Sequence, residues 1–341
     1  METPLVSICI PTFNGEKFLK SCLDSAIGQT YKNIEIIIND DNSSDKTYEI
    51  AKGYADRDSR IKLYCNEKNL GLVGNWNKCI ELSKGSWVKF LFQDDYFSKD
   101  CVVQMVNALS PNDKIVSSRR RLILDESLDE VTKKYSINET LTFEKLGILS
   151  EIPVYISPEK ISVLAVQNIS MNFIGEPTVI MFKKECIDEL GPFNSDLIQI
   201  CDLEYFLRIA CKYGVKYVPK QLTYFRVHKG SASSANFSER VFSMKNFDPI
   251  IMVHQLLYDK QYSLFRNALN GVQKIKLKLF FESRVYESYQ SAMRSPSNNL
   301  EKFEYVALKY PEIGRLRKGS FYIRALFVLV KMRRGWRKKC D

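Results

Sequence analysis

WVKFLFQDD, residues 87–95, is a short aromatic-rich apolar run that stops at two adjacent carboxylates, Asp94 and Asp95. A run of this length and composition is typical of a strand that is buried on both faces of a sheet. In open α/β sheets, ligands bind just beyond the carboxyl ends of the strands. Two acids at that point predict either a site for a hard divalent cation that holds a phosphate or a polar turn, which Asp also favours. These residues alone leave both interpretations open.

A second strand-like segment, residues 34–38, also ends close to paired acids, Asp40 and Asp41. Strand and helix signals alternate through residue 110, which predicts an α/β domain with a mostly parallel sheet. If the two strands are near neighbours, both acid pairs lie along one edge of that sheet. Carboxylates gathered there repel each other unless a cation or hydrogen-bond donors compensate them. The repeated arrangement therefore favours metal or nucleotide binding over a turn.

The composition of the 341 residues is that of an ordinary globular protein, with 45% hydrophobic and 26% charged residues. The first residues lack the long apolar core of a secretory signal, and no run reaches the roughly 18 apolar residues that a membrane span needs. The nine cysteines are scattered, and no pair forms a CxxC motif. We therefore expect reduced thiols in a cytosolic protein, without a disulfide framework or a zinc site.

Four segments of the chain together resemble the family 2 glycosyltransferases of the GT-A fold. The resemblance covers roughly residues 4 to 235, and the four motifs stand in the family's order. They are PTFNGEKFLKSCLDSAIGQTYKNIEIIINDDNSSDKT (11–47), NLGLVGNWNKCIELSKGSWVKFLFQDD (69–95), GPFNSDLIQICDLEYFLRIACKYG (191–214) and YFRVHKGSAS (224–233).

The resemblance implies a Rossmann-like, mostly parallel sheet flanked by helices, with a helical C-terminal extension. We expect a GT-A domain over residues 1–237, with a nucleotide-binding half (1–110) and an acceptor-side half (111–237), followed by a helical region over 238–341. The implied activity is inverting transfer of a sugar from a UDP-, GDP- or dTDP-sugar to an oligosaccharide or lipid-linked glycan acceptor. Surface polysaccharide synthesis, as of O-antigen or capsule, is the expected setting.

The donor site that the resemblance implies draws on both ends of the nucleotide-binding half. Phe13 is expected to stack on the base, with a core aromatic as the alternative, and Asp41 to contact the base edge. Asn75 either contacts the donor or caps a helix. The full set is Pro11, Thr12, Phe13, Asn14, Glu16, Asp41, Asn69, Asn75, Gln93 and Asp94.

The same resemblance implies a Mg²⁺ or Mn²⁺ ion that bridges the donor phosphates, held by Asp94, Asp95 and His228. This chain departs from the family pattern in one position, because the acid two residues before the last Asp is replaced by Gln93. Direct coordination then falls to Asp95, with Asp94 placing the sugar or a metal-bound water. Which of the two acids binds the metal directly stays open.

Asp202 matches the family's catalytic carboxylate, which implies that it is the general base of the displacement. It would take the proton from the acceptor hydroxyl while the anomeric carbon is attacked. The alternative is an Asp that stabilises the start of a helix. On the acceptor side we also expect Glu176, Glu204 and Arg208.

The positive charge of the chain is concentrated at its end. Residues 315–341 hold ten Lys or Arg and a single acid, Asp341, against a net charge of +10 for the whole chain. The apolar run SFYIRALFVLVKM (320–332) within this basic tail is typical of a helix on an anionic membrane surface. A core helix with a solvated basic end and a nucleic-acid tail are the alternatives, and without a base-reading motif we expect no nucleic acid.

We therefore expect a cytoplasmic enzyme that is peripherally bound to the inner face of the cell membrane through residues 319–339. The alternative is a catalytically silent nucleotide-sugar-binding subunit of a membrane-associated assembly complex. Gln93 in the metal motif is the feature that keeps this alternative open.

Overall fold

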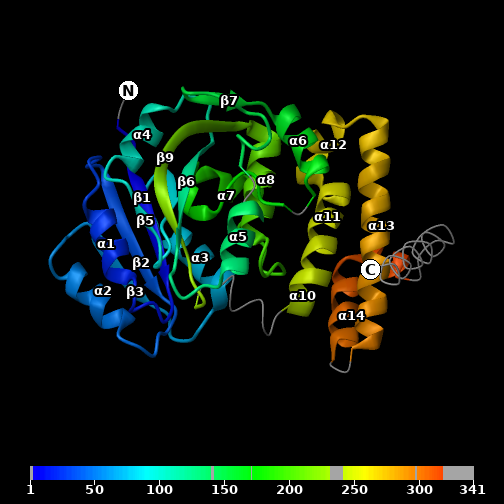
Figure 1. Ribbon diagram of the computed structural model, residues 1–341, viewed down its shortest axis with the longest axis horizontal. Helices are drawn as coiled ribbons and strands as arrows, with labels where there is room; N and C mark the ends of the chain where they lie inside the picture. The colour runs from blue at the N-terminus through cyan, green and yellow to red at the C-terminus, as the bar shows by residue number, and fades with distance from the viewer. Residues whose placement is uncertain (1–2, 140–141, 170, 231–240, 296–297, 318–341) are drawn as a thin grey trace. The chain divides into compact units, whose positions relative to one another are not determined.

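A computed structural model describes residues 3–139, 142–169, 171–230, 241–295 and 298–317 (Figure 1). The chain divides into unit 1, Met1–Ser195 with Ile200–Ala235, and unit 2, Asp196–Gln199 with Asn236–Asp341. The predicted membrane-surface segment 319–339 lies outside the described residues. Within the ranges that are described, no helix combines the length and the apolar character that crossing a membrane requires.

Unit 1 is built on a nine-stranded sheet in the order β3-β2-β1-β4-β8-β6-β9-β5, with β7 paired to β9. The strands are β1 (Val6–Thr12), β2 (Ile34–Asp40), β3 (Ile61–Cys65), β4 (Trp87–Phe90), β5 (Tyr96–Phe97), β6 (Ile115–Leu124), β7 (Val154–Ile156), β8 (Ile180–Lys183) and β9 (Val215–Val227). Six of these run in one direction, while β5, β7 and β8 run against their neighbours. The predicted mostly parallel α/β sheet of the GT-A type is thus confirmed.

The position of β1 between β2 and β4 brings the predicted ligand-binding ends together. β1 pairs in parallel with β2 up to Thr12 opposite Asp40, and with β4 up to Cys9 opposite Phe90. The strand that enters the QDD turn therefore ends at Phe90, and the chain leaves the sheet before it reaches Asp94. The two acid pairs follow strands that flank β1 on either side.

Helices cover the sheet of unit 1, and their apolar stripes form the core with the strands. The helices are α1 (Leu19–Ile27), α2 (Thr47–Ala55), α3 (Gly71–Leu82), α4 (Cys101–Asn107), α5 (Glu130–Glu139), α6 (Pro158–Gln167), α7 (Glu185–Leu190) and α8 (Cys201–Tyr213), with a 3-10 turn η1 (Pro177–Val179). On α1, the buried residues Leu19, Cys22, Leu23 and Ala26 recur at helical spacing and pack on β1 and β2. The polar, charge-mixed segment between β6 and β7 contains the helix α5, which its weak hydrophobic periodicity does not predict.

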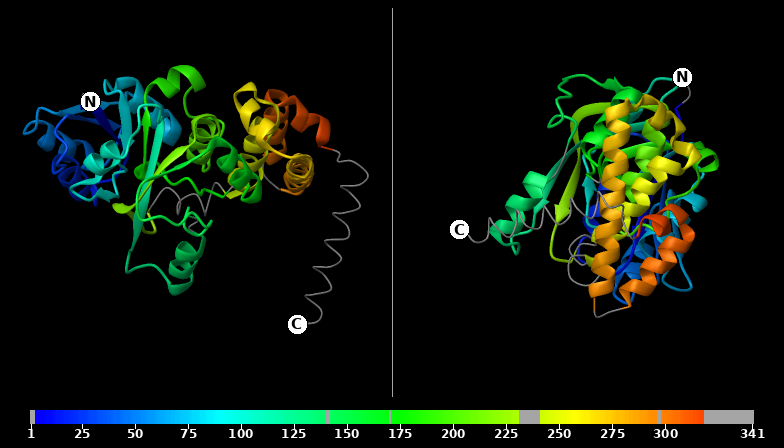
Figure 2. Two further views of the ribbon diagram at one scale, coloured as in Figure 1. Left: turned by 90° about the horizontal axis from the view of Figure 1, so that it is seen from above. Right: turned by 90° about the vertical axis from the view of Figure 1, so that its right-hand side faces the viewer.

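Unit 2 is helical in its described part. Its elements are α10 (Val241–Asn246), α11 (Asp248–Tyr258), η2 (Lys260–Tyr262), α12 (Ser263–Ala268), α13 (Gly271–Arg294), α14 (Asn299–Lys309) and α15 (Pro311–Leu316). Asn270 and Gln273 start α13 with a reciprocal capping box. Leu277, Phe281 and Val285 form the buried side of α13, which packs on α11 and α14 (Figure 2).

Candidate active site

The ends of β1 and β2 are tied together by the first acid pair. Thr12 Oγ1 donates to Asp40 Oδ1 over 2.9 Å, and Ser43 N donates to Asp40 Oδ2 over 2.9 Å. Asp40 is buried, and these hydrogen bonds compensate its charge. Asp40 therefore shapes the loop that follows β2.

Asp41, expected at the base edge, holds the start of α3. Its Oδ1 accepts from Leu70 N and from Asn66 Nδ2, each over 2.8 Å. Its Oδ2 accepts from Gly71 N over 3.0 Å. Asn69 closes the same turn, because its Oδ1 also accepts from Gly71 N, which has a left-handed φ of 76°. Both residues build this loop, and their contact with a nucleotide stays a prediction.

Gln93 stands where the family pattern has an acid, and it braces the end of β1. Its Oε1 accepts from Phe13 N over 2.9 Å, and its Nε2 donates to Phe13 O over 3.0 Å. The Phe13 side chain is 46% exposed, so it is not a core aromatic. Gly15 makes room for this pairing, because a Cβ there would lie 2.2 Å from Gln93 Cδ. A neutral amide thus positions an exposed aromatic ring beside the site.

Two further donor-site residues of the same loop bind to the neighbouring loop after β2. Asn14 has a left-handed φ of 47°, and its Oδ1 accepts from Ser44 N over 2.9 Å. Glu16 Oε2 accepts from Lys46 N over 3.0 Å. Their side chains therefore join the two loops, whatever else they contact.

Asn75, predicted either to contact the donor or to cap a helix, joins the ends of two strands instead of capping a helix. It is buried on α3, where its Oδ1 accepts from Asn39 Nδ2 over 2.6 Å. Its Nδ2 donates to Thr12 O over 3.2 Å. Pro11 and Thr12 are buried in β1 as well. These three residues support the edge of the sheet from within, and their contact with a donor stays a prediction.

The adjacent acids Asp94 and Asp95 point to different surroundings. Asp95 is fully buried, with Oδ2 accepting from Thr178 Oγ1 over 2.6 Å and Oδ1 accepting from Arg226 N over 2.9 Å. Burial, and then the neighbouring Asp94, raise the pKa of Asp95 well above its usual range. Asp94 keeps 21% of its side chain exposed, and its Oδ2 lies 3.0 Å from His228 Nε2.

The carboxylate of Asp94 and the imidazole of His228 could together coordinate a Mg²⁺ or Mn²⁺ ion, and they are more accessible than the buried carboxylate of Asp95. An oxygen and an imidazole nitrogen suit Mn²⁺, and Mg²⁺ is commonly bound by one or two carboxylates with substrate phosphates filling the other positions. In the described part of the chain, no three His, Cys, Asp or Glu side chains gather as a metal-binding group. Asp95 has two internal hydrogen bonds, whereas Asp94 is partly exposed beside His228. Which of the two acids coordinates a metal directly stays a prediction.

Three basic side chains pack against the ring of Phe18, next to Asp94. The guanidinium of Arg226 lies 4.4 Å from the centre of the Phe18 ring, and Lys17 Nζ lies 4.6 Å from it. The His228 ring meets Phe18 edge-on at 4.8 Å. Arg226 Nε also donates to Asp94 O over 3.0 Å. Phe18 was not among the predicted site residues.

Asp202 lies in the first turn of α8. Its Oδ2 accepts from Asn172 Nδ2 over 3.0 Å and its Oδ1 from Leu203 N over 2.7 Å. Withdrawal from solvent, with a further contribution from the charge of Glu176, raises the pKa of Asp202 to about 7. A carboxylate with such a pKa can accept a proton near neutral pH, as a general base must.

Glu176 connects the two acidic parts of the site. Its Oε1 lies 2.8 Å from a guanidinium nitrogen of Arg120 on β6. Its charge also raises the pKa of both Asp202 and Asp95, so it is within electrostatic reach of each. Glu176 immediately precedes η1, which carries Thr178, the partner of Asp95. Sequence reasoning missed Arg120 and Thr178, although a run of three arginines in a strand-like segment was a usable signal for the first.

Lys89 is a third residue that sequence reasoning missed. It is fully buried in β4, its Nζ donates to Thr178 O, and it lies 4.7 Å from the centre of the Phe97 ring. Burial lowers the pKa of Lys89 to about 8, while the nearby Asp95 acts in the opposite direction. A lysine inside an apolar strand was the available signal.

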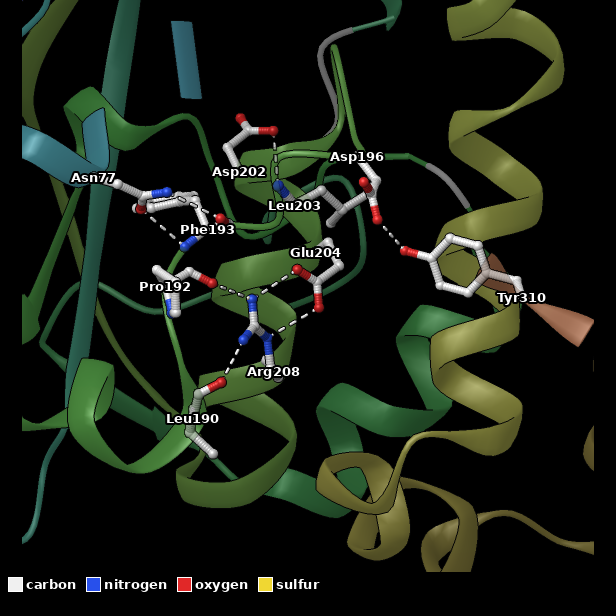
Figure 3. Close-up of polar contacts among 10 residues, drawn as sticks. All are labelled: Asn77, Leu190, Pro192, Phe193, Asp196, Asp202, Leu203, Glu204, Arg208 and Tyr310. Atoms are coloured by element: carbon white, nitrogen blue, oxygen red, sulfur yellow. Dashed lines mark hydrogen bonds and ion pairs between the residues drawn. The ribbon is translucent and has the colours of Figure 1, made fainter. Parts of the chain in front are cut away.

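Glu204 and Arg208, expected on the acceptor side, pair with each other. Glu204 is fully buried, and it accepts from Arg208 Nε over 2.9 Å and from a second guanidinium nitrogen over 2.8 Å. Arg208 also donates to Leu190 O and Pro192 O, which fixes the loop after α7 (Figure 3). The Asp202 carboxylate points away from this pair. Burial and pairing give Glu204 and Arg208 a structural role, in line with the alternative that Arg208 pairs with a nearby carboxylate. Contact of either residue with an acceptor stays a prediction.

Comparison with known proteins agrees with this architecture. Residues 7–158 match the sequence family described as Glycosyl transferase family 2. Residues 1–349 of TarS of S. aureus, bound to UDP-GlcNAc, superpose with a TM-score of 0.59 at 15% identity, covering 92% of this chain and 84% of that fragment. The mannosyltransferase PcManGT of Pyrobaculum calidifontis, bound to GDP-Man and Mn²⁺, gives 0.54 at 16% identity, covering 96% and 87%. Unit 1 is therefore a GT-A fold.

Proteins of similar sequence include glycosyltransferases, in agreement with the fold. WfaP of Escherichia coli, a UDP-Glc:alpha-D-GlcNAc-diphosphoundecaprenol beta-1,3-glucosyltransferase, is 26% identical over 79% of this chain and 95% of its own length. The putative glycosyltransferase EpsH of Bacillus subtilis is 38% identical over 34% of this chain. Residues 7–158 of this chain thus resemble family 2 of the glycosyltransferases in sequence. The chain spans only 33% of EpsH and 66% of an uncharacterized Mycobacterium tuberculosis protein that is 30% identical to it.

Replacing Arg208 by Ala should destabilise the fold, because it leaves Glu204 buried without its cation. We expect the free energy of unfolding to fall by about 3–5 kcal/mol, measured by urea denaturation. As a matched control, the double variant Glu204→Leu/Arg208→Met fills the same space without charge and should recover much of the loss. An Arg208→Ala protein with wild-type stability but a raised acceptor KM would contradict the structural role.

Replacing Gly15 by Ala should displace Gln93 from the Phe13 backbone, because the new Cβ would occupy the place of the amide. We expect nucleotide binding, measured by calorimetry, to weaken by roughly tenfold, the effect of losing about two hydrogen bonds. In a Gln93→Ala background the same substitution should have little further effect, since the amide is already absent. Additive losses in the double variant would show that Gly15 acts through something other than Gln93.

Proposed function

We propose that this chain is an inverting, metal-dependent glycosyltransferase that moves a sugar from a nucleoside-diphosphate sugar to a hydroxyl of a lipid-linked oligosaccharide. One observation carries the proposal: the segment from Asn172 to Thr178 contacts both acids, because Asn172 Nδ2 donates to Asp202 Oδ2 over 3.0 Å and Thr178 Oγ1 donates to Asp95 Oδ2 over 2.6 Å. A displacement needs a leaving-group site and a base around one sugar ring, and a single segment that holds the expected base and an acid beside the expected diphosphate site supports that requirement.

The donor side of the proposal is a UDP-sugar held by Phe13, Asp94 and His228. WfaP is named for a UDP-Glc donor and TarS was solved with UDP-GlcNAc, which supports uridine as the base. The exposed ring of Phe13 offers a stacking surface for it. Asp94 and His228 would hold a Mg²⁺ or Mn²⁺ ion, as the Mn²⁺ bound to PcManGT suggests. When bound, the metal neutralises the charge that develops on the leaving diphosphate.

Asp202 performs the proton transfer in the proposed reaction. Its carboxylate accepts the proton of the acceptor hydroxyl while that oxygen forms its bond to the anomeric carbon. The bond between the anomeric carbon and the diphosphate breaks in the same step, and the nucleoside diphosphate leaves. Asn172 holds one oxygen of Asp202 over 3.0 Å, which orients the carboxylate for this task.

The acceptor and the cellular setting rest on the relatives. WfaP is named for a diphosphoundecaprenol-linked acceptor, which supports a lipid-linked glycan here and a role in surface polysaccharide synthesis such as O-antigen or capsule. With such an acceptor, we propose that the enzyme works in the cytoplasm at the inner face of the membrane. Residues 319–339, with their apolar core and basic flanks, are proposed to hold it there.

Replacing Asp202 by Asn should abolish transfer while leaving nucleotide binding intact, because an amide cannot accept the proton. In the wild-type enzyme, the acid limb of the kcat profile should fall about tenfold per pH unit below pH about 7, where Asp202 becomes protonated. Measuring product formation and UDP binding side by side checks both statements. Transfer by the variant at near the wild-type rate would exclude Asp202 as the base.

Thermal unfolding provides the folding control for this variant. The folded protein binds more protons than the unfolded chain between pH about 4 and about 7, because the pKa of Asp202 is raised on folding. Its contribution to stability therefore decreases as pH rises through that window. Asp202→Asn should consequently be at least as stable as the wild type at pH 8, so that lost activity does not reflect unfolding.

Metal dependence distinguishes an active glycosyltransferase from the alternative, a catalytically silent nucleotide-sugar-binding subunit. Gln93 first suggested that alternative, but the amide has a defined partner in the Phe13 backbone. We expect Mn²⁺ to tighten UDP binding and to be required for donor hydrolysis, with Asp94→Asn losing both effects. Screening UDP-, GDP- and dTDP-sugars under these conditions also identifies the donor. Binding that ignores the metal, with no hydrolysis of any donor, would favour the silent subunit.

A further inference from the structure

Unit 2 exposes large aliphatic side chains next to lysines at the junction of α12 and α13. Val272 is 77% exposed, Ile275 61%, Leu264 50% and Leu279 44%. Lys260, Lys274, Lys276 and Lys278 are exposed among them. We call these eight residues the α12–α13 face.

The apolar residues of α13 form a stripe on the side opposite the packed one. Val272, Ile275 and Leu279 recur at i, i+3 and i+7, so they share one side of the helix. The buried residues Leu277 and Phe281 recur at i and i+4 on the other side, toward the rest of unit 2. α13 is the long helix beside α14 in Figure 2. It has two apolar stripes, one packed against the rest of unit 2 and one exposed to solvent.

The charge of this segment has a single sign. Residues 260–281 contain five Lys or Arg and no Asp or Glu. Arg266 donates to Leu256 O and Asp259 O and so belongs to the fold. The four lysines have no acidic partner within the described ranges, where every recorded ion pair uses other cations.

We propose that the α12–α13 face binds the surface of an anionic lipid bilayer. At 100° per residue, Lys276 and Lys278 stand at the two borders of the exposed aliphatic stripe, whereas Lys274 is turned toward the packed side of α13. An aliphatic stripe bordered by lysines is the arrangement of an interfacial helix, which buries its apolar side chains at the headgroup level and pairs its cations with lipid phosphates. The lysines gain most from a partner of negative charge, and the aliphatic side chains gain from one that removes them from water.

Charge argues against the other occupants of the face. A second copy of the chain, related by a two-fold axis, would bring two sets of lysines together. The tail from residue 315 is also strongly basic, with ten Lys or Arg to one acid, so docking it here would add like charge. A nucleic acid would use aromatic platforms for its bases, whereas these exposed residues are aliphatic.

This contact is separate from the membrane segment 319–339 that was proposed from the sequence. It is also separate from the proposed reaction, because binding to vesicles is measured without donor or acceptor. Two spaced contacts with one surface act together, since the first raises the local concentration of the second.

Vesicle sedimentation of the full chain tests the proposal. We expect wild-type protein to bind phosphatidylglycerol vesicles and to bind phosphatidylcholine vesicles much more weakly. Lys274→Gln/Lys276→Gln/Lys278→Gln should weaken partitioning to the anionic vesicles by roughly a hundredfold, because each lysine near the surface contributes favourably. Lys20→Gln/Lys84→Gln/Lys302→Gln removes the same charge from other exposed positions and serves as the matched control.

Two further triple variants make the result decisive. Val272→Ser/Ile275→Ser/Leu279→Ser should also weaken binding, and the charge-conserving Lys274→Arg/Lys276→Arg/Lys278→Arg should retain it. Circular dichroism and unchanged thermal unfolding confirm that each variant is folded. If both the glutamine and the serine variants bind as the wild type does, the tail alone holds the protein and the proposal is wrong.

A local readout addresses the face directly, whatever the tail contributes. In Ile275→Trp, the new indole should be quenched by brominated phosphatidylglycerol beyond the quenching of wild-type protein. Absence of additional quenching would overturn the proposal. A wild-type protein that self-associates without lipid, and becomes monomeric in the serine variant, would show instead that the face joins two copies of the chain.

Discussion

The buried carboxylate of Asp95 is the constraint on which the geometry of the site depends. A charge withdrawn from water is tolerated only when donors surround it. Thr178 from η1 and the Arg226 amide from β9 supply those donors, and Lys89 reaches the Thr178 carbonyl from β4. Three segments far apart in the chain are thereby held at one point. Asp94 is exposed next to His228 because its neighbour is fixed inward.

Neutral groups perform much of the remaining positioning. Gln93 braces the Phe13 backbone, and Asn75 joins the ends of β1 and β2 from beneath. Amides can donate and accept at once, so they fix a loop without adding charge to an edge that already holds several carboxylates. Gln93, which stands in place of an acid of the metal motif, therefore fixes the loop on the nucleotide side of the site.

The sequence predicted the α/β sheet and most of its strands because hydrophobic periodicity is a local property. It could not predict how Asp94 and Asp95 diverge, since Thr178 lies 83 residues and Arg226 131 residues further along the chain. The sequence could, however, have predicted the direction of the Glu204 side chain. Residues two apart on a helix point about 200° away from each other, so a site at Asp202 already directs Glu204 to the opposite side. Motif matching by position overlooked this geometry.

The segment between β6 and β7 leaves and re-enters the sheet along the same strand. β6 pairs with β9 in parallel and β7 pairs with it antiparallel, so both ends of residues 125–153 are anchored on β9. The hydrogen bonds that define the sheet are complete on either side of this excursion. The excursion is nevertheless tied to the core, because its Phe143 is buried against Phe173 and Tyr217 and its Glu144 accepts from Arg119 of β6 and Tyr217 of β9. A change in this segment would therefore be felt at the strands that carry Arg120 and Arg226.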